Sequence, residues 1–120
     1  WLILGLFFLY ILFYLCLRPG SGQQMTIPHF DKVLHFTAYF SLSYYFHQIF
    51  KDKHSSKLII MLTLIGILIE FLQEISVNRT FEYLDMITNS VGAIVGSIAS
   101  MAVSKNILKL LESKLERKAP

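Results

Sequence analysis

The sequence predicts an all-α, polytopic membrane protein with four transmembrane helices and an interfacial, amphipathic C-terminal helix. Of its 120 residues, 54% are hydrophobic and only 16% are charged, whereas soluble domains carry about 25% charged residues. The mean hydropathy is +0.54, and the apolar residues fall in blocks rather than at amphipathic spacing. At this length we expect a single domain that covers residues 1–120.

The first apolar block, residues 1–17, reads WLILGLFFLYILFYLCL and contains no charge. As a helix it would reach about 26 Å, slightly less than a hydrocarbon core of about 30 Å. The chain begins with Trp1 rather than methionine, which leaves room for missing residues upstream. A signal peptide is the alternative, but the block lacks a basic n-region and a small-x-small cleavage site. The following RPGSGQQ is typical of a loop.

Three further apolar segments predict spanning helices over residues 32–50, 58–75 and 86–103. They are separated by KDKHSSK and SVNRTFEYLD. In the tail, residues 105–118, apolar side chains share one face opposite Lys and Glu, which predicts a helix lying in the membrane interface. These apolar side chains are Ile107, Leu108, Leu111 and Leu115.

The distribution of Lys and Arg predicts the orientation of the four spans. One side would hold Lys51, Lys53, Lys57, Lys105, Lys109, Lys114, Arg117 and Lys118. The other side would hold only Arg18, Lys32 and Arg79. We therefore expect both termini to be cytoplasmic, with the basic tail drawn to anionic lipids of the inner leaflet. The net charge of +3 then reports topology, and no nucleic-acid partner is predicted.

The polar residues of the spans gather toward the extracytoplasmic side. Ionisable groups in a span cost about 2.5–3.5 kcal/mol each, so they are expected to face the bundle and one another. Three helices that bring such groups to one level predict a shared ligand-binding pocket. Its candidate residues are Asp31, His35, Tyr39, Glu70, Gln73, Arg79, Asp85 and Asn89.

Arg79 is the expected counter-charge of this pocket, since several carboxylates cannot all stay ionised in a dry site without one. It would also suit a carboxylate or phosphate ligand. Lys32 is expected to extend toward the membrane surface, and Glu82 toward solvent. Simpler roles compete with the functional ones, because Asp31 and Asp85 could each cap or begin a helix.

Small residues predict where the helices approach closely. Gly92, Gly96 and Ser100 recur every four residues, which is the small-xxx-small spacing of helix interfaces in membranes. Gly66 could serve the same purpose in the third helix. The single cysteine, Cys16, excludes an internal disulfide framework and a thiolate metal cluster.

The ordered stretches DKVLHFTAY, EFLQ, NRTFEYLD and MITNSVG resemble the VanZ-like family of small bacterial integral membrane proteins, over about residues 28–97. The resemblance implies a single VanZ-like transmembrane domain in the cell envelope. The family takes its name from a protein associated with teicoplanin resistance, which links it to glycopeptide resistance but supplies no reaction. The matching positions are Asp31, Lys32, His35, Tyr39, Glu70, Gln73, Arg79, Asp85, Asn89 and Gly92.

Three classes of function fit these residues. The first is binding of membrane lipids or a lipid-linked envelope precursor through a head group that carries phosphate or an amine. The second is an enzyme in which Glu70 or Asp85 is the general acid or base, with His35 as its partner and Arg79 holding an anion. The third is a structural or adaptor protein whose polar residues only join the helices.

No cofactor or metal is predicted. A Gly-rich phosphate loop, a Ser-His-Asp elbow and an HExxH motif are missing from the sequence. His35, Glu70 and Asp85 are chemically suitable ligands for a divalent cation, but they come from three separate helices, and their spacing gives a metal site no strong support.

Overall fold

The computed structural model describes residues 1–17, 29–50, 55–75, 81–103 and 107–117, which form helices and no strand. The all-helical class is therefore confirmed for this part of the chain. The helices α2, α3 and α4 begin two or three residues before their predicted starts. In chain order the bounds are α1 Leu2–Leu17, α2 Phe30–Phe50, α3 Ser55–Ile75, α4 Tyr83–Ala102 and α5 Ile107–Glu116.

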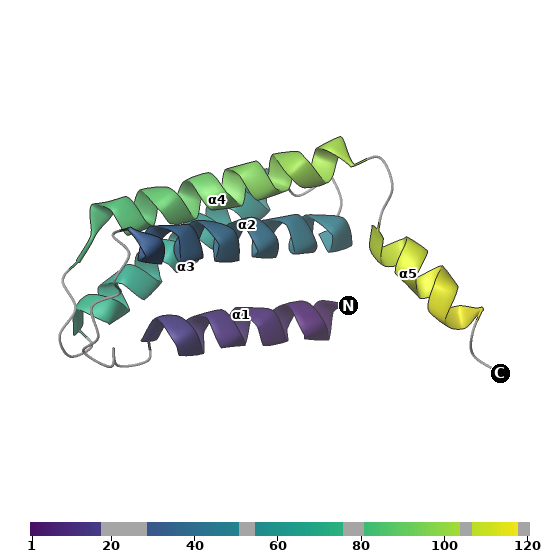
Figure 1. Cartoon of the computed structure of the whole chain (residues 1–120), viewed down its shortest axis with the longest axis horizontal. Coiled ribbons are helices and arrows are strands. Elements are labelled where there is room, and N and C mark those ends of the chain that lie inside the picture. The colour runs from purple at the N-terminus through teal and green to yellow at the C-terminus, as the bar shows by residue number, and fades with distance from the viewer. Residues whose placement is uncertain (18–28, 51–54, 76–80, 104–106, 118–120) are drawn as a thin grey trace.

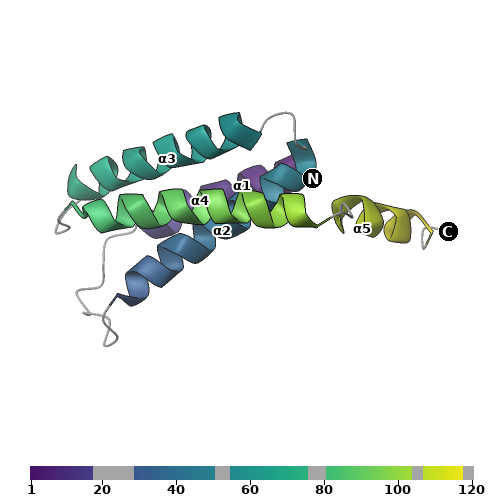
Figure 2. The same cartoon turned by 90° about the horizontal axis from the view of Figure 1, so that it is seen from above.

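Helices α1 to α4 alternate in direction, as Figure 1 shows. The ends of α1 and α3 and the starts of α2 and α4 lie at one end of the molecule, at the left of the figure. We call this the cluster end. Helix α5 extends beyond the opposite end. Seen from above in Figure 2, α3 lies beside α4, and α2 crosses behind α4.

The closest approach in the bundle is between α2 and α4, because α4 presents glycines to the backbone of α2. A Cβ atom added at Gly92 would lie 2.6 Å from the carbonyl oxygen of Phe36, and one at Gly96 would overlap the carbonyl oxygen of Phe40. Only a residue without a side chain fits at such a contact. The close packing predicted for the fourth helix is thus confirmed.

The α2–α4 interface is also polar along its length. Ser43 Oγ donates to the carbonyl oxygen of Ala93 at 2.6 Å, and His47 Nδ1 lies 3.1 Å from Ser97 Oγ. Farther along, Gln48 donates to the hydroxyl oxygen of Ser100 at 2.8 Å. Such contacts join helices where no water is available to hydrogen-bond with them. Nothing in the sequence indicates a partner for His47, and its contact with Ser97 becomes evident only once α2 faces α4.

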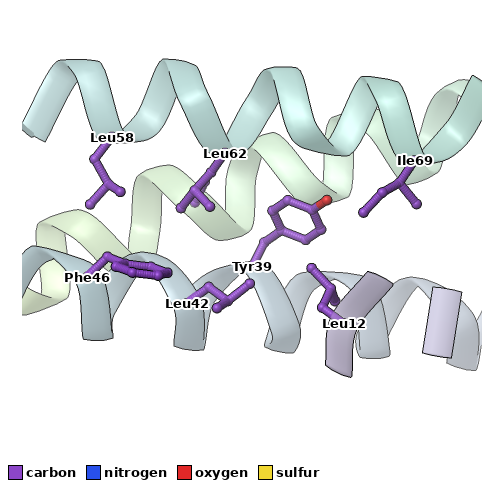
Figure 3. Packing of buried hydrophobic residues seen from close by; sticks show 8 residues of the cluster. Leu12, Tyr39, Leu42, Phe46, Leu58, Leu62 and Ile69 are labelled. Carbon is purple, nitrogen blue, oxygen red and sulfur yellow. The ribbon is translucent and has the colours of Figure 1, made fainter. Parts of the chain in front are cut away.

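The apolar core is formed mainly by α2 and α3, with contributions from α1 and α4 (Figure 3). Outside it, large apolar side chains remain exposed over the helices, as at Ile3 and Ile75. A soluble monomer seldom presents so much exposed apolar surface. The buried core residues are Leu12, Tyr39, Leu42, Phe46, Leu58, Leu62, Ile69 and Ala93.

Two described helical segments, Ser56–Ile75 and Tyr83–Ala102, are long and apolar enough to cross a membrane. Helix α1 is apolar but shorter. Helix α2 has sufficient length, but with its charged and polar residues it is not among the helices apolar enough to cross a membrane by this measure. The expectation of four spans is therefore supported for two helices by length and composition, and the complete four-span topology is taken up as a proposal below.

Helix α5 is attached to the bundle at its first turn. The N–H group of Ile107 donates to Gln48 Oε1 at 3.1 Å, and Leu108 is buried. Leu111 and Leu115 of the same predicted apolar face stay exposed, as expected of a helix that lies against a membrane surface.

Several sequence-based expectations fall outside the described residues. The loop expected at RPGSGQQ is one of them, and the counter-charge expected at Arg79 is another. The same holds for some of the basic residues that define the predicted topology, namely Arg18, Lys51, Lys53, Lys105 and Lys118.

Candidate functional site

Lys32 lies at the centre of an ionic cluster at the cluster end. Its ammonium nitrogen is 2.9 Å from Asp31 Oδ2 on the same helix. It is also 2.5 Å from Glu82 Oε2 and 2.8 Å from Asp85 Oδ1, both at the start of α4. We call Lys32, Asp31, Glu82 and Asp85 the Lys32 cluster, and it joins the first turns of α2 and α4.

The cluster corrects the expectation for Lys32 and adds a partner for Glu82, which is exposed as expected. Lys32 turns inward, with 16% of its side chain exposed, and pairs with carboxylates instead of extending to the membrane surface. Glu82 takes part in the pairing, although its side chain is still 47% exposed. In the described part of the chain, Lys32 is therefore the counter-charge of Asp31, Glu82 and Asp85.

Asp31 and Asp85 occupy first turns rather than cap positions. Helix α2 begins at Phe30, and the N-cap residue of α4 is Glu82. Carboxylates in a first turn also interact favourably with the positive end of the helix dipole. Asp85 is the more deeply placed of the two, with only 3% of its side chain exposed, so it depends most on Lys32.

His35 extends the cluster one helical turn deeper. Its Nε2 atom is 3.7 Å from Asp85 Oδ2, and its Nδ1 atom is 3.1 Å from Asn89 Oδ1. Because an amide oxygen can only accept, Nδ1 carries the proton in this contact. Nε2 then faces Asp85 at a distance longer than a hydrogen bond, and the two side chains are of the kinds that general acid–base chemistry uses.

Glu70 connects α3 to the start of α4. Its side chain is buried, and its Oε1 atom accepts a hydrogen bond from the backbone N–H of Glu82 at 2.7 Å. The first N–H groups of a helix have no partner within the helix. In a capping box, a carboxylate from the first turn bonds to the N–H of the cap residue; here Glu70 performs that role from the neighbouring helix.

Replacing Glu70 with alanine should destabilise the protein by about 1–3 kcal/mol, because the backbone N–H of Glu82 loses its charged acceptor. Glu70→Gln keeps an acceptor oxygen and should cost less. Thermal unfolding of the purified protein in detergent, followed by circular dichroism, measures both. Glu74→Gln, an exposed acid one turn farther along α3, is the control. Equal losses for the alanine and glutamine variants would show that the hydrogen bond is not what matters.

Gln73 ties α1 to α3, since its Nε2 atom donates to the carbonyl oxygen of Cys16 at 2.7 Å. Its Oε1 atom, the hydroxyl of Tyr39 and the Nδ2 atom of Asn89 are buried and have no hydrogen-bond partner among the described residues. Figure 3 shows the Tyr39 ring between α2 and α3. Buried polar atoms of this kind are costly unless a water or ligand supplies a partner.

A pocket of about 280 Å³ lies beside the Lys32 cluster, between α1, α2 and α3. Asp31, His35 and Gln73 form its polar part. The remaining candidates in the described part of the chain, Tyr39, Glu70, Asp85 and Asn89, are buried in the helix interfaces behind it. Its apolar lining comes from Leu12, Leu15, Cys16, Leu34 and Ala38.

Among the described residues, three carboxylates could be arranged around a metal ion, those of Asp31, Glu82 and Asp85. One oxygen from each lies within 4.8 Å of the others. This set differs from the trio considered from the sequence, because only Asp85 belongs to both. Lys32 already lies among these oxygens and supplies the positive charge. We therefore do not assign a metal to this site.

The chain matches a known protein family over most of its length. A sequence model of the VanZ/LLP1 family matches residues 2–104. The chain belongs to the VanZ/LLP1 family. The match confirms the VanZ-like resemblance and extends it over α1 to α4. Comparisons with curated proteins and with solved structures found no match.

The VanZ-like motifs on α2 and α4 contact each other in register. Lys32 pairs with Asp85, and His35 lies against Asn89 one turn farther along. After another turn, Gly92 approaches the backbone of Phe36. The motif residues of these two helices thus form a single interface. Glu70, from the EFLQ stretch on α3, contacts the end of this interface by accepting a hydrogen bond from the N–H of Glu82.

Proposed function

We propose that this VanZ-family protein crosses the bacterial cytoplasmic membrane four times, with both termini inside and the cluster end facing outward. The alternating directions of α1 to α4 support this topology (Figure 1). So does the excess of Lys and Arg on the side of the tail. A reporter fused after residue 118 should be cytoplasmic, and an external signal from that fusion would reverse the topology.

We further propose that the cluster end binds the head group of a lipid or a lipid-linked cell-wall precursor. The observation that carries this proposal is the pocket beside the Lys32 cluster, where Asp31, His35 and Gln73 meet an otherwise apolar lining. Polar groups at one end of an apolar pocket suit an amphiphile. A wall precursor as ligand would connect the protein to the glycopeptide resistance linked to its family.

The proposal is tested with the full chain in nanodiscs that contain phosphatidylethanolamine, phosphatidylglycerol or an isoprenyl phosphate, with bound lipid counted by native mass spectrometry. Wild-type protein should retain at least one of these lipids, whereas His35→Ala should retain about tenfold less, as expected for one lost polar contact to the head group. His29→Ala, an exposed histidine just before α2, is the control.

The outcomes separate binding from a purely structural role. If His35→Ala folds and retains as much lipid as the His29→Ala control, the proposed binding site is wrong. If the variant unfolds, circular dichroism will show it, and Asp31→Asn then serves as the second variant because Asp31 lies at the partly exposed start of α2. Unchanged lipid retention in Asp31→Asn would favour the adaptor role.

An enzymatic role is the second candidate, and the His35–Asp85 contact of 3.7 Å beside the pocket favours it. An imidazole next to a carboxylate can transfer a proton to or from a bound substrate. The same nanodisc samples are analysed for modified or cleaved lipid. Binding without any new lipid product, in wild-type protein and in Asp85→Asn alike, would exclude catalysis on these three lipids.

A further inference from the structure

A second cavity lies along the interface of α1 and α2. Its volume is about 440 Å³, within the usual range of about 300–1,000 Å³ for small-molecule sites. Phe8, Ile11, Leu12 and Leu15 line it on α1, and side chains between residues 38 and 45 line it on α2. Its walls are almost entirely apolar, which suits a hydrocarbon chain.

This cavity adjoins the pocket beside the Lys32 cluster. Leu12, Leu15 and Ala38 line both spaces. Taken together, the two spaces have a lining that is apolar along the middle of α1 and polar at Asp31 and Gln73, near the cluster end. We call this combined space the α1–α2 trough. Its lining, apolar along most of its length and polar at one end, matches a lipid with one polar end.

The trough stays open because α1 is fastened to the bundle near both of its ends. At one end, the hydroxyl of Tyr45 donates to the carbonyl oxygen of Trp1 at 2.9 Å. At the other end, Gln73 donates to the carbonyl oxygen of Cys16 at 2.7 Å. Between these two bonds α1 and α2 touch at side chains such as the edge-to-face rings of Phe8 and Tyr45, and the trough lies alongside these contacts.

The polar end of the trough offers hydrogen-bond acceptors. Gln73 is 2% exposed, and its Oε1 atom has no partner in the part of the chain that the structure describes. Asp31 adds a carboxylate. The nearby cation, Lys32, already donates to three carboxylates. A ligand group that donates hydrogen bonds and carries positive charge complements this end of the trough.

We propose that the α1–α2 trough binds a lipid with a primary ammonium head group, whose hydrocarbon chain lies between α1 and α2 while the ammonium group contacts Asp31 and Gln73. This inference rests on the proposed head-group binding and narrows it to one class of lipid. It also assigns α1, which carries none of the VanZ-like motif residues, the role of holding the hydrocarbon chain.

The test uses the full chain in vesicles of phosphatidylcholine that contain a trace of photoactivatable lipid. The probe is phosphatidylethanolamine with a diazirine in its acyl chain, and phosphatidylcholine and phosphatidylglycerol with the same chain are the comparisons. After illumination, cross-linked peptides are mapped by mass spectrometry. The ethanolamine probe should label residues 8–15 and 38–45 about tenfold more than either comparison lipid, because neither provides an ammonium N–H donor.

Two matched substitutions locate the site. Ser41 is exposed and lines the cavity, so Ser41→Trp should fill the trough without disturbing the core and reduce labelling about tenfold. Thr37→Trp, one turn earlier on the same helix and also exposed, should leave labelling unchanged. Asp31→Asn should reduce labelling by the ethanolamine probe to the level of the two comparison lipids.

Equal labelling by all three probes, or labelling that Ser41→Trp does not reduce, would overturn the inference and show that the trough only meets bulk lipid. The proposed function is judged separately by lipid retention in the His35→Ala protein. If His35→Ala reduces lipid retention but Ser41→Trp does not reduce photolabelling, only the assignment of the trough is wrong. If neither substitution has an effect, the head-group site fails as well.

Discussion

Replacing Lys32 with methionine should destabilise the protein by about 3 kcal/mol. Removing one partner of a buried ion pair typically costs about 3–5 kcal/mol, because the other charge is left uncompensated. The effect should lie at the low end, since Asp31 and Glu82 keep 31% and 47% of their side chains exposed. Most of the loss therefore comes from Asp85, which is buried beside Lys32.

Thermal unfolding in nanodiscs of uncharged lipid measures this loss. Lys57→Met is the matched control, because Lys57 is an exposed lysine in the first turn of α3. Surface substitutions of this kind usually change stability by less than about 0.5 kcal/mol. If the Lys32 and Lys57 variants unfold at the same temperature, Lys32 does not hold α2 to α4.

The second large effect is expected for Gly96→Ala. The added methyl group would overlap the carbonyl group of Phe40, and backbone atoms inside a helix cannot move aside as a flexible side chain can. Overpacking of this kind costs about 1–3 kcal/mol and occasionally more. We expect the upper end, about 3 kcal/mol, because separating α2 from α4 also weakens the contacts of Ser43 and His47 with α4.

Gly5→Ala is the control for steric substitution in a helix. A Cβ at Gly5 would lie 2.9 Å from ring atoms of Tyr45 and Phe46. Side-chain rings can shift by a few tenths of an ångström, so this variant should lose clearly less stability. Circular dichroism melts of the two variants in the same detergent provide the comparison. Equal tolerance at both positions would mean that the α2–α4 contact is looser than described.

Much of the fold could be predicted from the sequence, because apolar blocks and small-residue spacing are local signals. The positions of the helices follow from uncharged runs such as residues 1–17, and Gly92 and Gly96 indicated a close helix contact. The VanZ-like pattern indicated which polar residues belong together. Helix α2 was also predicted as a span, but its polar residues lower the hydropathy on which such a prediction depends.

The contacts between residues of the site could not be predicted from the sequence, because they depend on how each helix is rotated about its axis. A lysine at a helix end can extend to the membrane surface or turn inward, and only the position of α4 decides that Lys32 pairs with Asp85. The bond from Gln73 to the backbone of Cys16 leaves no sequence signal, since every residue has a carbonyl group. Glu82 was assigned to solvent because nothing in the sequence places it beside Lys32.

The account rests on the direct contact between the first turns of α2 and α4, and a double-mutant cycle on Lys32 and Asp85 tests it most directly. The free energy of unfolding is measured for wild-type protein, Lys32→Met, Asp85→Asn and the double variant. Residues in contact couple by about 0.5–3 kcal/mol, whereas distant residues are additive. We expect a coupling above about 1 kcal/mol, with the double variant more stable than the sum of the single losses predicts. Additive losses would place the two motifs apart and contradict the site described here.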